Sequence, residues 1–542
     1  MASAAALVAL RVAARECHLA TPSFSDEQAA CGLAVADVLR ARFLPLSTSA
    51  QAAAPLLQLP AELLAVILYI LDTRDLAHLA ATCRSLCHDA PPPLPLPRQI
   101  GPVETELRRR AEARGLDVGS SLPEGATSWV MCLLKRDRRD AQMRQAPLAL
   151  ASDHSIFLDT DGRLLTCGRD TIGFPPVLGH AVDPDADPNI RREHGPPTPV
   201  PSMQDRRIVS VATSFSHSLA LSAEGEVFSW GGGAYGALGH GDTGKRTVPS
   251  KIESLSCIEH IAAGPNWTSA AVDEKGRLFT WGRAISDNAE EESDGELDKS
   301  EGQGGLGYEL DAEAEYQATP KRVVALSQER VVGVALGDGF TLAVTDAGAV
   351  FSFGFSRHGG LGHGSSDSEV LPRRIEAMAQ TRRRLVDVAA GGCHALALTE
   401  EGEPYGWGDG DANGHGRAER TPQRVAALIG QRIKLVNTRF FSSCAVTERG
   451  ELFTWGDTSC AYKKNGIQVM PKRVDGLSGV EVAAVAIGWA HTLAADADGV
   501  VWGCGRRALL GLGALGPEDE DSAAVRTPTP IPTLRMRVLN SP

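Results

Sequence analysis

Seven pairs of glycines with one constant spacing recur between residues 162 and 505 of this chain. In every pair the second glycine stands six residues after the first: 162/168, 225/231, 276/282, 348/354, 402/408, 450/456 and 499/505. A spacing that is kept seven times indicates a repeated structural unit. Glycine also adopts the positive φ that tight hairpin turns require, so the first glycine of each pair predicts a turn.

The residues around each pair predict short β-strands. Within the pairs, apolar residues alternate with polar or small ones, as in GEVFSWG (225–231) and GELFTWG (450–456). This period of two is typical of a strand with one buried face. Another apolar run precedes each turn glycine, as in SLALSAEG (218–225), and a proline introduces a further strand, as in PKRV (320–323). About four strands in roughly 50 residues are typical of a propeller blade.

We therefore predict a mainly β fold, a seven-bladed β-propeller of four-stranded blades, over residues 148–542. The second glycines are 63, 51, 72, 54, 48 and 49 residues apart, and the two long intervals mark insertions at about 173–197 and at 284–305. We expect both insertions to be loops, the second of them solvated because it carries eight acids and one lysine. For closure of the ring, we expect RMRVL (535–539) to pair in the first blade; PLALA (147–151) competes for that place.

The repeat resembles the regulator-of-chromosome-condensation repeat, whose pattern is VxVAxGxxHTLAL…GxVxxWGxGxxGxLGHG. The best local matches are residues 207–241 and 385–410, and the resemblance covers roughly 148–542. It implies a propeller that binds proteins through its rim loops. The family's founding member implies an alternative, guanine-nucleotide exchange on a small GTPase. The plant ultraviolet-B receptor implies another, light sensing through repeated GWRHT motifs, but the one comparable stretch here, GWAHT (488–492), has alanine in place of arginine.

A different pattern precedes the repeats, LLQLPAELLAVILYILDTRDLAHLAATCRSLCHDA at residues 56–90. Its leucines fall on one helical face, with Pro60 in the first turn of a helix and Asp72 as the cap of the next. The segment 55–90 resembles the all-α F-box module, with the pattern LPxELLxxIL…DLxxLxxxCRxL. The resemblance implies docking on a Skp-type adaptor of a cullin-based ubiquitin ligase, through Leu59, Pro60, Leu63, Leu64, Ile67, Leu71, Leu76 and Leu79. A helical pair that packs only on its own chain is the alternative.

Two further segments flank this module. Residues 1–54 form an Ala-rich amino-terminal extension, for which a transit peptide is the alternative. Residues 91–147 form a linker that opens with PPPLPLP and continues with two expected helices, at 105–115 and 127–140. Because acids interleave with the basic residues of this linker, we expect a solvated connector rather than a nucleic-acid patch.

The sequence offers no motif for catalysis, a cofactor or a metal. HExxH, GxSxG and P-loop patterns do not occur, and the two GxGxxG matches (231–236 and 302–307) precede strand segments instead of a helix. Eleven cysteines include no CxxC pair, which argues against a zinc site.

Four histidines need a separate explanation, since His154, His217, His394 and His491 each stand eight residues before a turn glycine. The other three blades have Thr268, Phe340 and Ser442 at this position. A catalytic or metal-binding ring does not tolerate such replacements, so we predict structural hydrogen bonds between blade strands.

Charge and hydropathy narrow the classes of partner. Lys and Arg total 54 against 67 Asp and Glu, a net charge of −13, so we do not expect nucleic acid as a partner. No apolar run reaches the ~20 residues of a membrane helix. We predict a non-enzymatic substrate receptor of a ubiquitin ligase, in the cytoplasm or the nucleus or both, whose F-box binds a Skp-type adaptor and cullin and whose propeller binds a substrate protein. A scaffold or exchange factor for a small GTPase is the alternative.

Overall fold

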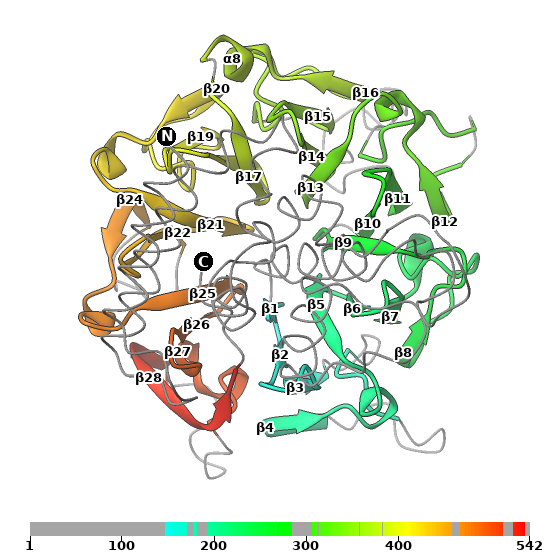
Figure 1. Ribbon diagram of the computed structural model, residues 1–542, viewed down its shortest axis with the longest axis vertical. Coiled ribbons are helices and arrows are strands. Elements are labelled where there is room, and N and C mark those ends of the chain that lie inside the picture. Colours follow the sequence, from blue (N-terminus) through cyan, green and yellow to red (C-terminus); the bar gives the residue numbers. More distant parts are fainter. Residues whose placement is uncertain are drawn as a thin grey trace, which may run out of the picture. The chain divides into compact units, whose positions relative to one another are not determined.

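The computed structural model describes residues 147–170, 177–181, 192–265, 267–283, 305–311, 314–356, 358–381, 383–457, 467–512 and 524–536. The predicted extension (1–54), the predicted F-box module (55–90) and nearly all of the predicted linker lie outside these residues. The described residues form seven four-stranded sheets, and neighbouring strands within every sheet are antiparallel and consecutive in the chain. Figure 1 shows the seven sheets arranged as blades around a common axis. The prediction of a mainly β, seven-bladed propeller of four-stranded blades is confirmed.

The strands of each blade are given from the axis outward, which is also their order in the chain. Blade 1 has β1 (Leu148–Leu150), β2 (His154–Leu158), β3 (Leu164–Asp170) and β4 (Arg192–Pro199); blade 2 has β5 (Ile208–Thr213), β6 (His217–Ser222), β7 (Val227–Gly231) and β8 (Arg246–Lys251); blade 3 has β9 (Ile258–Ala263), β10 (Thr268–Asp273), β11 (Leu278–Arg283) and β12 (Tyr316–Arg322). Blade 4 has β13 (Val331–Leu336), β14 (Phe340–Thr345), β15 (Val350–Gly354) and β16 (Glu369–Arg374); blade 5 has β17 (Leu385–Ala390), β18 (His394–Thr399), β19 (Pro404–Gly408) and β20 (Glu419–Arg424). Blade 6 has β21 (Ile433–Arg439), β22 (Ser442–Thr447), β23 (Leu452–Gly456) and β24 (Gln468–Arg473); blade 7 has β25 (Val482–Ile487), β26 (His491–Asp496), β27 (Val500–Arg506) and β28 (Ala524–Arg535).

Short helical turns connect these strands. They are the 3-10 turns η4 (Pro201–Met203), η5 (Ala234–Gly236), η7 (Val324–Leu326), η8 (Ala426–Leu428), η10 (Asp475–Leu477) and η11 (Arg507–Leu509), and the α-helix α8 (Glu376–Gln380). Most of them occupy the connection from one blade to the next.

The second strand of each blade is buried on both faces, because neighbouring sheets pack against it from either side. In β6, β18 and β22, for example, every residue is buried, and small Ala and Ser side chains alternate there with larger apolar ones. The apolar clusters therefore join adjacent blades: one contains Leu396 of blade 5 together with Ile433 and Trp455 of blade 6. The core is a ring of such interfaces between blades.

The turn glycines also bind each blade to the next. At all seven junctions the carbonyl oxygen of the turn glycine accepts a hydrogen bond from a backbone N–H at the start of the following inner strand. The pairs are Gly162–Ile208, Gly225–Ile258, Gly276–Val331, Gly348–Leu385, Gly402–Ile433, Gly450–Val482 and Gly499–Met536, with N···O distances of 2.8 to 3.3 Å. The glycines are thus required twice, for their positive φ and for the approach of the neighbouring blade.

The last of these pairs shows how the ring closes, and both candidate segments take part. Strand β1 pairs with β2 through Leu148, Ala149 and Leu150, so PLALA supplies most of the inner strand of blade 1. Met536 pairs with Asp159 at the same edge of β2, and its N–H bonds to Gly499 of blade 7. The expectation that RMRVL pairs in the first blade is confirmed at Met536, and the competing segment PLALA supplies the other paired residues of this inner strand in the described part of the chain.

Two expectations for the outer strands also need correction. The outer strands begin three or four residues before their prolines, as in β12, where Tyr316 precedes Pro320. Proline is tolerated there because the outermost strand has an edge without a hydrogen-bonding neighbour. Residues 192–197, expected to lie in the first loop insertion, belong to β4 instead. The second insertion, 284–305, lies outside the described residues except for Gly305.

Candidate functional site

None of the residues predicted to bind the adaptor lies in the described part of the chain. They are Leu59, Pro60, Leu63, Leu64, Ile67, Leu71, Leu76 and Leu79. Their assignment remains a prediction, and the candidate sites that can be built from geometry are those of the propeller.

His154, His217, His394 and His491, the four histidines of the repeat, each form a hydrogen bond to the following blade. Their Nε2 atoms lie 2.8 to 3.2 Å from a serine Oγ on the second strand of the following blade: His154–Ser218, His217–Ser269, His394–Ser443 and His491–Ser155. The prediction of a structural role between blade strands is confirmed, and the strands belong to neighbouring blades.

The serine partners determine which imidazole nitrogen carries the proton. Ser443 donates its hydroxyl hydrogen to the carbonyl of Ala412 at 2.8 Å, so it can only accept from His394, which must be protonated on Nε2. The same carbonyl accepts the indole N–H of Trp455 at 2.7 Å. Histidine, serine, loop carbonyl and tryptophan thus form one network that joins blades 5 and 6.

This network recurs at the junction of blades 2 and 3, where Ser269 and Trp281 both donate to the carbonyl of Ala237. The tryptophans before the second glycine of a pair therefore help to hold these blades together.

Burial keeps these imidazoles neutral. Desolvation lowers the pKa of His154, His217 and His491 to about 3 and that of His394 to about 4, because the charged form is unfavourable in the interior. The positive charge of Arg439 lowers the pKa of His154 and His217 further. A buried histidine with so low a pKa is a poor proton carrier near neutral pH.

The blades without histidine explain why the ring tolerates replacement. Blade 4 has Phe340 at the histidine position, and blade 5 has Ala395 at the position of the serine partner. Both side chains belong to one apolar cluster, so no hydrogen bond is needed there. The chain thus uses a polar pair at some junctions and an apolar pair at another. This alternation is expected of packing and argues against shared chemistry along the ring.

The loops between first and second strands lie on the same face of the propeller as those between third and fourth strands, because each sheet is an antiparallel meander. We call this the loop face. Two groups of aromatic residues lie on it. In the first, the rings of Phe440 in blade 6 and Trp489 in blade 7 meet edge to face with centroids 5.0 Å apart. The Arg439 guanidinium lies 5.3 Å from the Phe440 ring centroid.

The second aromatic group lies between blades 2 and 3. Tyr235 contacts Trp267 and Tyr316 with ring centroids 6.2 and 6.3 Å apart, and the Arg283 guanidinium lies 4.4 Å from the Tyr235 centroid. Tyr235 and Trp267 both have positive φ, an uncommon conformation for large side chains. Tyr316 is 41% exposed, whereas Tyr235 and Trp267 are half-buried and Arg283 is buried. Aromatic residues and arginine are enriched at protein-binding surfaces. The sequence reasoning did not identify either group.

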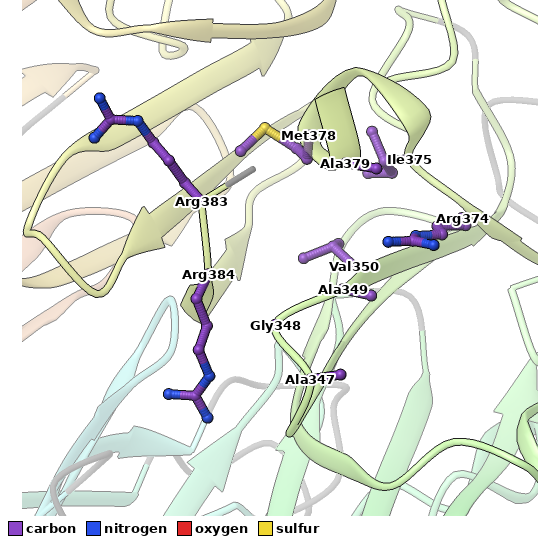
Figure 2. A pocket seen from close by; sticks show the side chains of 10 residues that line it. All are labelled: Ala347, Gly348, Ala349, Val350, Arg374, Ile375, Met378, Ala379, Arg383 and Arg384. Atoms are coloured by element: carbon purple, nitrogen blue, oxygen red, sulfur yellow. The ribbon is translucent and has the colours of Figure 1, made fainter. Parts of the chain in front are cut away.

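A cavity of about 230 Å³ lies between the hairpin turn of blade 4, helix α8 and the start of β17. Figure 2 shows Val350, Ile375 and Met378 in the cavity lining together with Arg374, while the side chains of Arg383 and Arg384 extend away from it. Arg383 pairs with Glu403, and Arg384 lies 3.5 Å from Glu400. Because Arg383 and Arg384 are already paired with glutamates, they do not indicate an anion site in this cavity.

The described residues include no group of three His, Cys, Asp or Glu side chains arranged to hold a metal ion. Within that same part of the chain, no helix has the length and hydropathy needed to span a bilayer.

Comparison with known proteins agrees with the repeat pattern. Two profiles of the regulator of chromosome condensation (RCC1) repeat match this chain, one at residues 224–271 and 347–398 and the other at 208–237 and 385–417. The human E3 ubiquitin-protein ligase HERC2 is 38% identical over 312 residues, which are 55% of this chain and 6% of HERC2. The ultraviolet-B receptor UVR8 of Arabidopsis thaliana is 30% identical over 309 residues, 55% of this chain and 65% of UVR8.

The chain therefore spans less than two thirds of the length of either relative. Among solved structures, Prp20p from Saccharomyces cerevisiae, described with its binding properties to Gsp1p and histones, aligns with a TM-score of 0.53 at 21% identity. The alignment covers 72% of this chain and 89% of Prp20p, and at this identity it shows the fold alone. The seven blades, the profile matches and these relatives together identify the repeats of this chain as RCC1 repeats that form a β-propeller.

Proposed function

We propose that this protein is the substrate-recognition subunit of a Skp-cullin-F-box type ubiquitin ligase. The observation that carries the proposal is the F-box-like pattern LPAELLAVIL…DLAHLAATCRSL at residues 59–86, which precedes an RCC1-repeat propeller in the same chain. On this proposal the segment 55–90 docks on a Skp-type adaptor, and the propeller binds the substrate protein. The chain acts in the cytoplasm, the nucleus or both.

The propeller suits the binding of a substrate protein because the residues that hold its blades together differ from those exposed on its loops. Buried histidines, serines, tryptophans and turn glycines join the blades, whereas the two aromatic groups lie on loops of one face. Loops on a rigid scaffold vary without loss of the fold. The similarity to a segment of HERC2, a protein named as an E3 ubiquitin-protein ligase, adds support for use of such a propeller in ubiquitin transfer.

On this proposal the chain itself breaks and forms no covalent bond. It acts by proximity: a substrate held on the propeller has its lysines at high effective concentration near the ubiquitin-loaded enzyme. The affinity of the two docking events, and not a perturbed catalytic side chain, then sets the rate.

Adaptor docking is tested by capture of a Skp-type adaptor and cullin with the full-length chain. We expect the double variant Leu59→Ala/Pro60→Ala to lose both proteins while the circular dichroism of its strands stays unchanged. The matched control is Leu94→Ala/Pro95→Ala, which changes another Leu-Pro pair outside the motif and leaves capture intact. Retained capture by the first variant would refute the docking role of the motif.

A second candidate function is a scaffold or nucleotide-exchange factor for a small GTPase. The observation that favours it is the likeness of the propeller to Prp20p, whose binding to Gsp1p has been described. The two functions separate in a nucleotide-release assay with purified candidate GTPases. The ligase proposal predicts no acceleration of release by this chain, whereas the exchange function predicts release that depends on its concentration.

A further inference from the structure

Blade 6 departs from the other blades at the last residue of its inner strand β21, Arg439. Alignment of the inner strands by their hairpin registers places Arg439 where the other blades have small residues: Ala151, Ser214, Gly264, Gly337, Gly391 and Gly488. Arginine is the largest and the only charged side chain in this set.

Steric reasons explain why blades 4 and 5 have glycine at this position. In blades 4 and 5, a Cβ at Gly337 or Gly391 would clash with the ring of Phe340 or His394 three residues later. In blade 6 the corresponding residue is Ser442, whose side chain has no ring. The absence of a ring leaves room for a long side chain at Arg439, whereas the small side chains of Ala151 and Ser214 coexist with the rings of His154 and His217.

The guanidinium of Arg439 is only partly satisfied by the protein. Its Nε and Nη2 atoms are shielded from solvent and have no hydrogen-bond acceptor in the described part of the chain. The described residues also place no carboxylate in an ion pair with it. Burial lowers its pKa to about 10, which still leaves it charged at neutral pH. A buried charge without an anionic partner is unfavourable, and binding of an anion relieves that cost.

Two exposed aromatic residues lie on the β21–β22 loop of blade 6 and on the β25–β26 loop of blade 7. Phe441 is 43% exposed and Trp489 is 54% exposed, although both are large apolar side chains. Phe440, between Arg439 and Phe441, contacts the Trp489 ring and has a positive φ of 47°. Exposed apolar residues that cluster, rather than scatter, mark interaction surfaces.

We propose that these four residues, Arg439, Phe440, Phe441 and Trp489, form a docking site for a protein segment in which an Asp or Glu side chain stands next to an apolar side chain. We call them the Arg439 patch. The carboxylate binds the guanidinium of Arg439, and the neighbouring apolar side chain packs on Phe441 and Trp489. The proposal concerns the propeller alone and does not depend on what the amino-terminal residues bind.

Charge complementarity selects this ligand. One guanidinium beside an aromatic ring matches one carboxylate beside an apolar group, because Arg and carboxylate form short, charge-assisted and often paired hydrogen bonds. The net charge of −13 disfavours a polyanion such as nucleic acid, which needs many cations along its path. Trp and Arg are also the residue types that most often dominate the free energy of protein association.

The test selects random displayed peptides on the immobilised full-length chain, with removal of those that also bind the Arg439→Gln variant. We expect the retained peptides to share an Asp or Glu next to an aromatic or aliphatic residue. A synthetic peptide from this set should bind the wild type at least about tenfold more tightly than Arg439→Gln. The same peptide with Gln in place of Glu, or Asn in place of Asp, should bind the wild type more weakly. Its affinity for the Arg439→Gln variant should equal that of the acidic peptide.

Three further variants keep the result interpretable. Trp489→Ala removes an exposed side chain, which does not endanger folding, and we expect it to weaken the same peptide by about tenfold. Arg374→Gln and Leu371→Ala change an exposed arginine and an exposed leucine of blade 4 and should leave binding unchanged. No enrichment of acidic peptides over the Arg439→Gln variant, or equal binding of the selected peptides to both proteins, overturns the proposal.

Discussion

Removal of the Ser443 hydroxyl should destabilise the propeller more than removal of its histidine partner. In the folded chain, Ser443 accepts from His394 Nε2 and donates to Ala412, both at 2.8 Å. Ser443→Ala leaves the buried Nε2–H of His394 without an acceptor. His394 Nδ1 has no hydrogen-bond partner among the described residues either, so the ring retains none there. We expect a loss of about 1–3 kcal/mol in the free energy of unfolding.

The substitution His394→Phe leaves fewer buried polar groups without a hydrogen-bond partner than Ser443→Ala does. In His394→Phe, Ser443 still donates to Ala412, so the expected cost is about 0.5–1.5 kcal/mol, the value of one net hydrogen bond. The double variant His394→Phe/Ser443→Ala copies the junction that blades 4 and 5 already have, with Phe340 opposite Ala395. Because both partners are then apolar, we expect its stability to lie within about 1 kcal/mol of the wild type.

The same double variant should be less sensitive to acid. Burial lowers the pKa of His394 to about 4 from an ordinary 6.5, so below pH 6.5 the unfolded chain binds more protons than the folded one. Stability therefore falls as the pH decreases from 6.5 towards 4. Between pH 7 and pH 5 this one histidine costs about 2 kcal/mol. The double variant should gain about that amount relative to the wild type over this interval.

The assay is urea unfolding of the full chain, followed by tryptophan fluorescence and circular dichroism, at pH 7 and pH 5. Coincidence of the two signals checks that unfolding is a single transition. The reasoning fails if Ser443→Ala is as stable as the wild type, or if the double variant is less stable than Ser443→Ala alone.

Three more outcomes follow from buried groups of the propeller. Arg439→Met removes a half-buried charge that has no anionic partner in the described residues and should raise the free energy of unfolding by about 1–3 kcal/mol in urea, while on the docking proposal it abolishes peptide binding. Burial raises the pKa of Asp387 to about 7, so the folded chain binds more protons than the unfolded one between about pH 4 and 7 and stability falls as the pH rises. Asp387→Asn should accordingly be more stable than the wild type at pH 8 and lose this advantage at pH 4.5. Met536→Ala should cost about 2–4 kcal/mol, because this buried side chain packs where the ring closes, whereas Arg535→Ala, at an exposed neighbour, should cost little.

The blade count and the strands could be predicted because each depends on a local pattern that recurs. The offset of six between glycines reports a hairpin turn and the end of the strand that follows it, and both features lie within a few residues. The start of each outer strand was placed late because proline was taken as its first residue. Only the position of that strand at the edge of the sheet explains why residues before the proline pair as well.

Closure of the ring could not be assigned from the sequence, because it depends on two short segments from opposite ends of the propeller. Leu148–Leu150 supplies three paired residues, and Met536 supplies the position that Ile208 has in blade 2. Each piece alone is too short to carry a recognisable strand pattern. Only a comparison of the hydrogen bonds at all seven blade junctions shows that the two segments together make up one inner strand.

The Arg439 patch was missed for a different reason. The sequence already showed that Ser442 stands where four other blades have histidine, but it gave no link between this position and residue 439 three places earlier. That link is steric, because in neighbouring blades the ring at one position occupies the space beside the small residue at the other. Taken singly, an arginine at the end of a strand is an ordinary exposed residue, and a serine in a histidine ring is an ordinary loss of a hydrogen bond. Their occurrence together on one loop, beside the exposed Trp489, is what indicates a surface selected for binding and not for the stability of the ring.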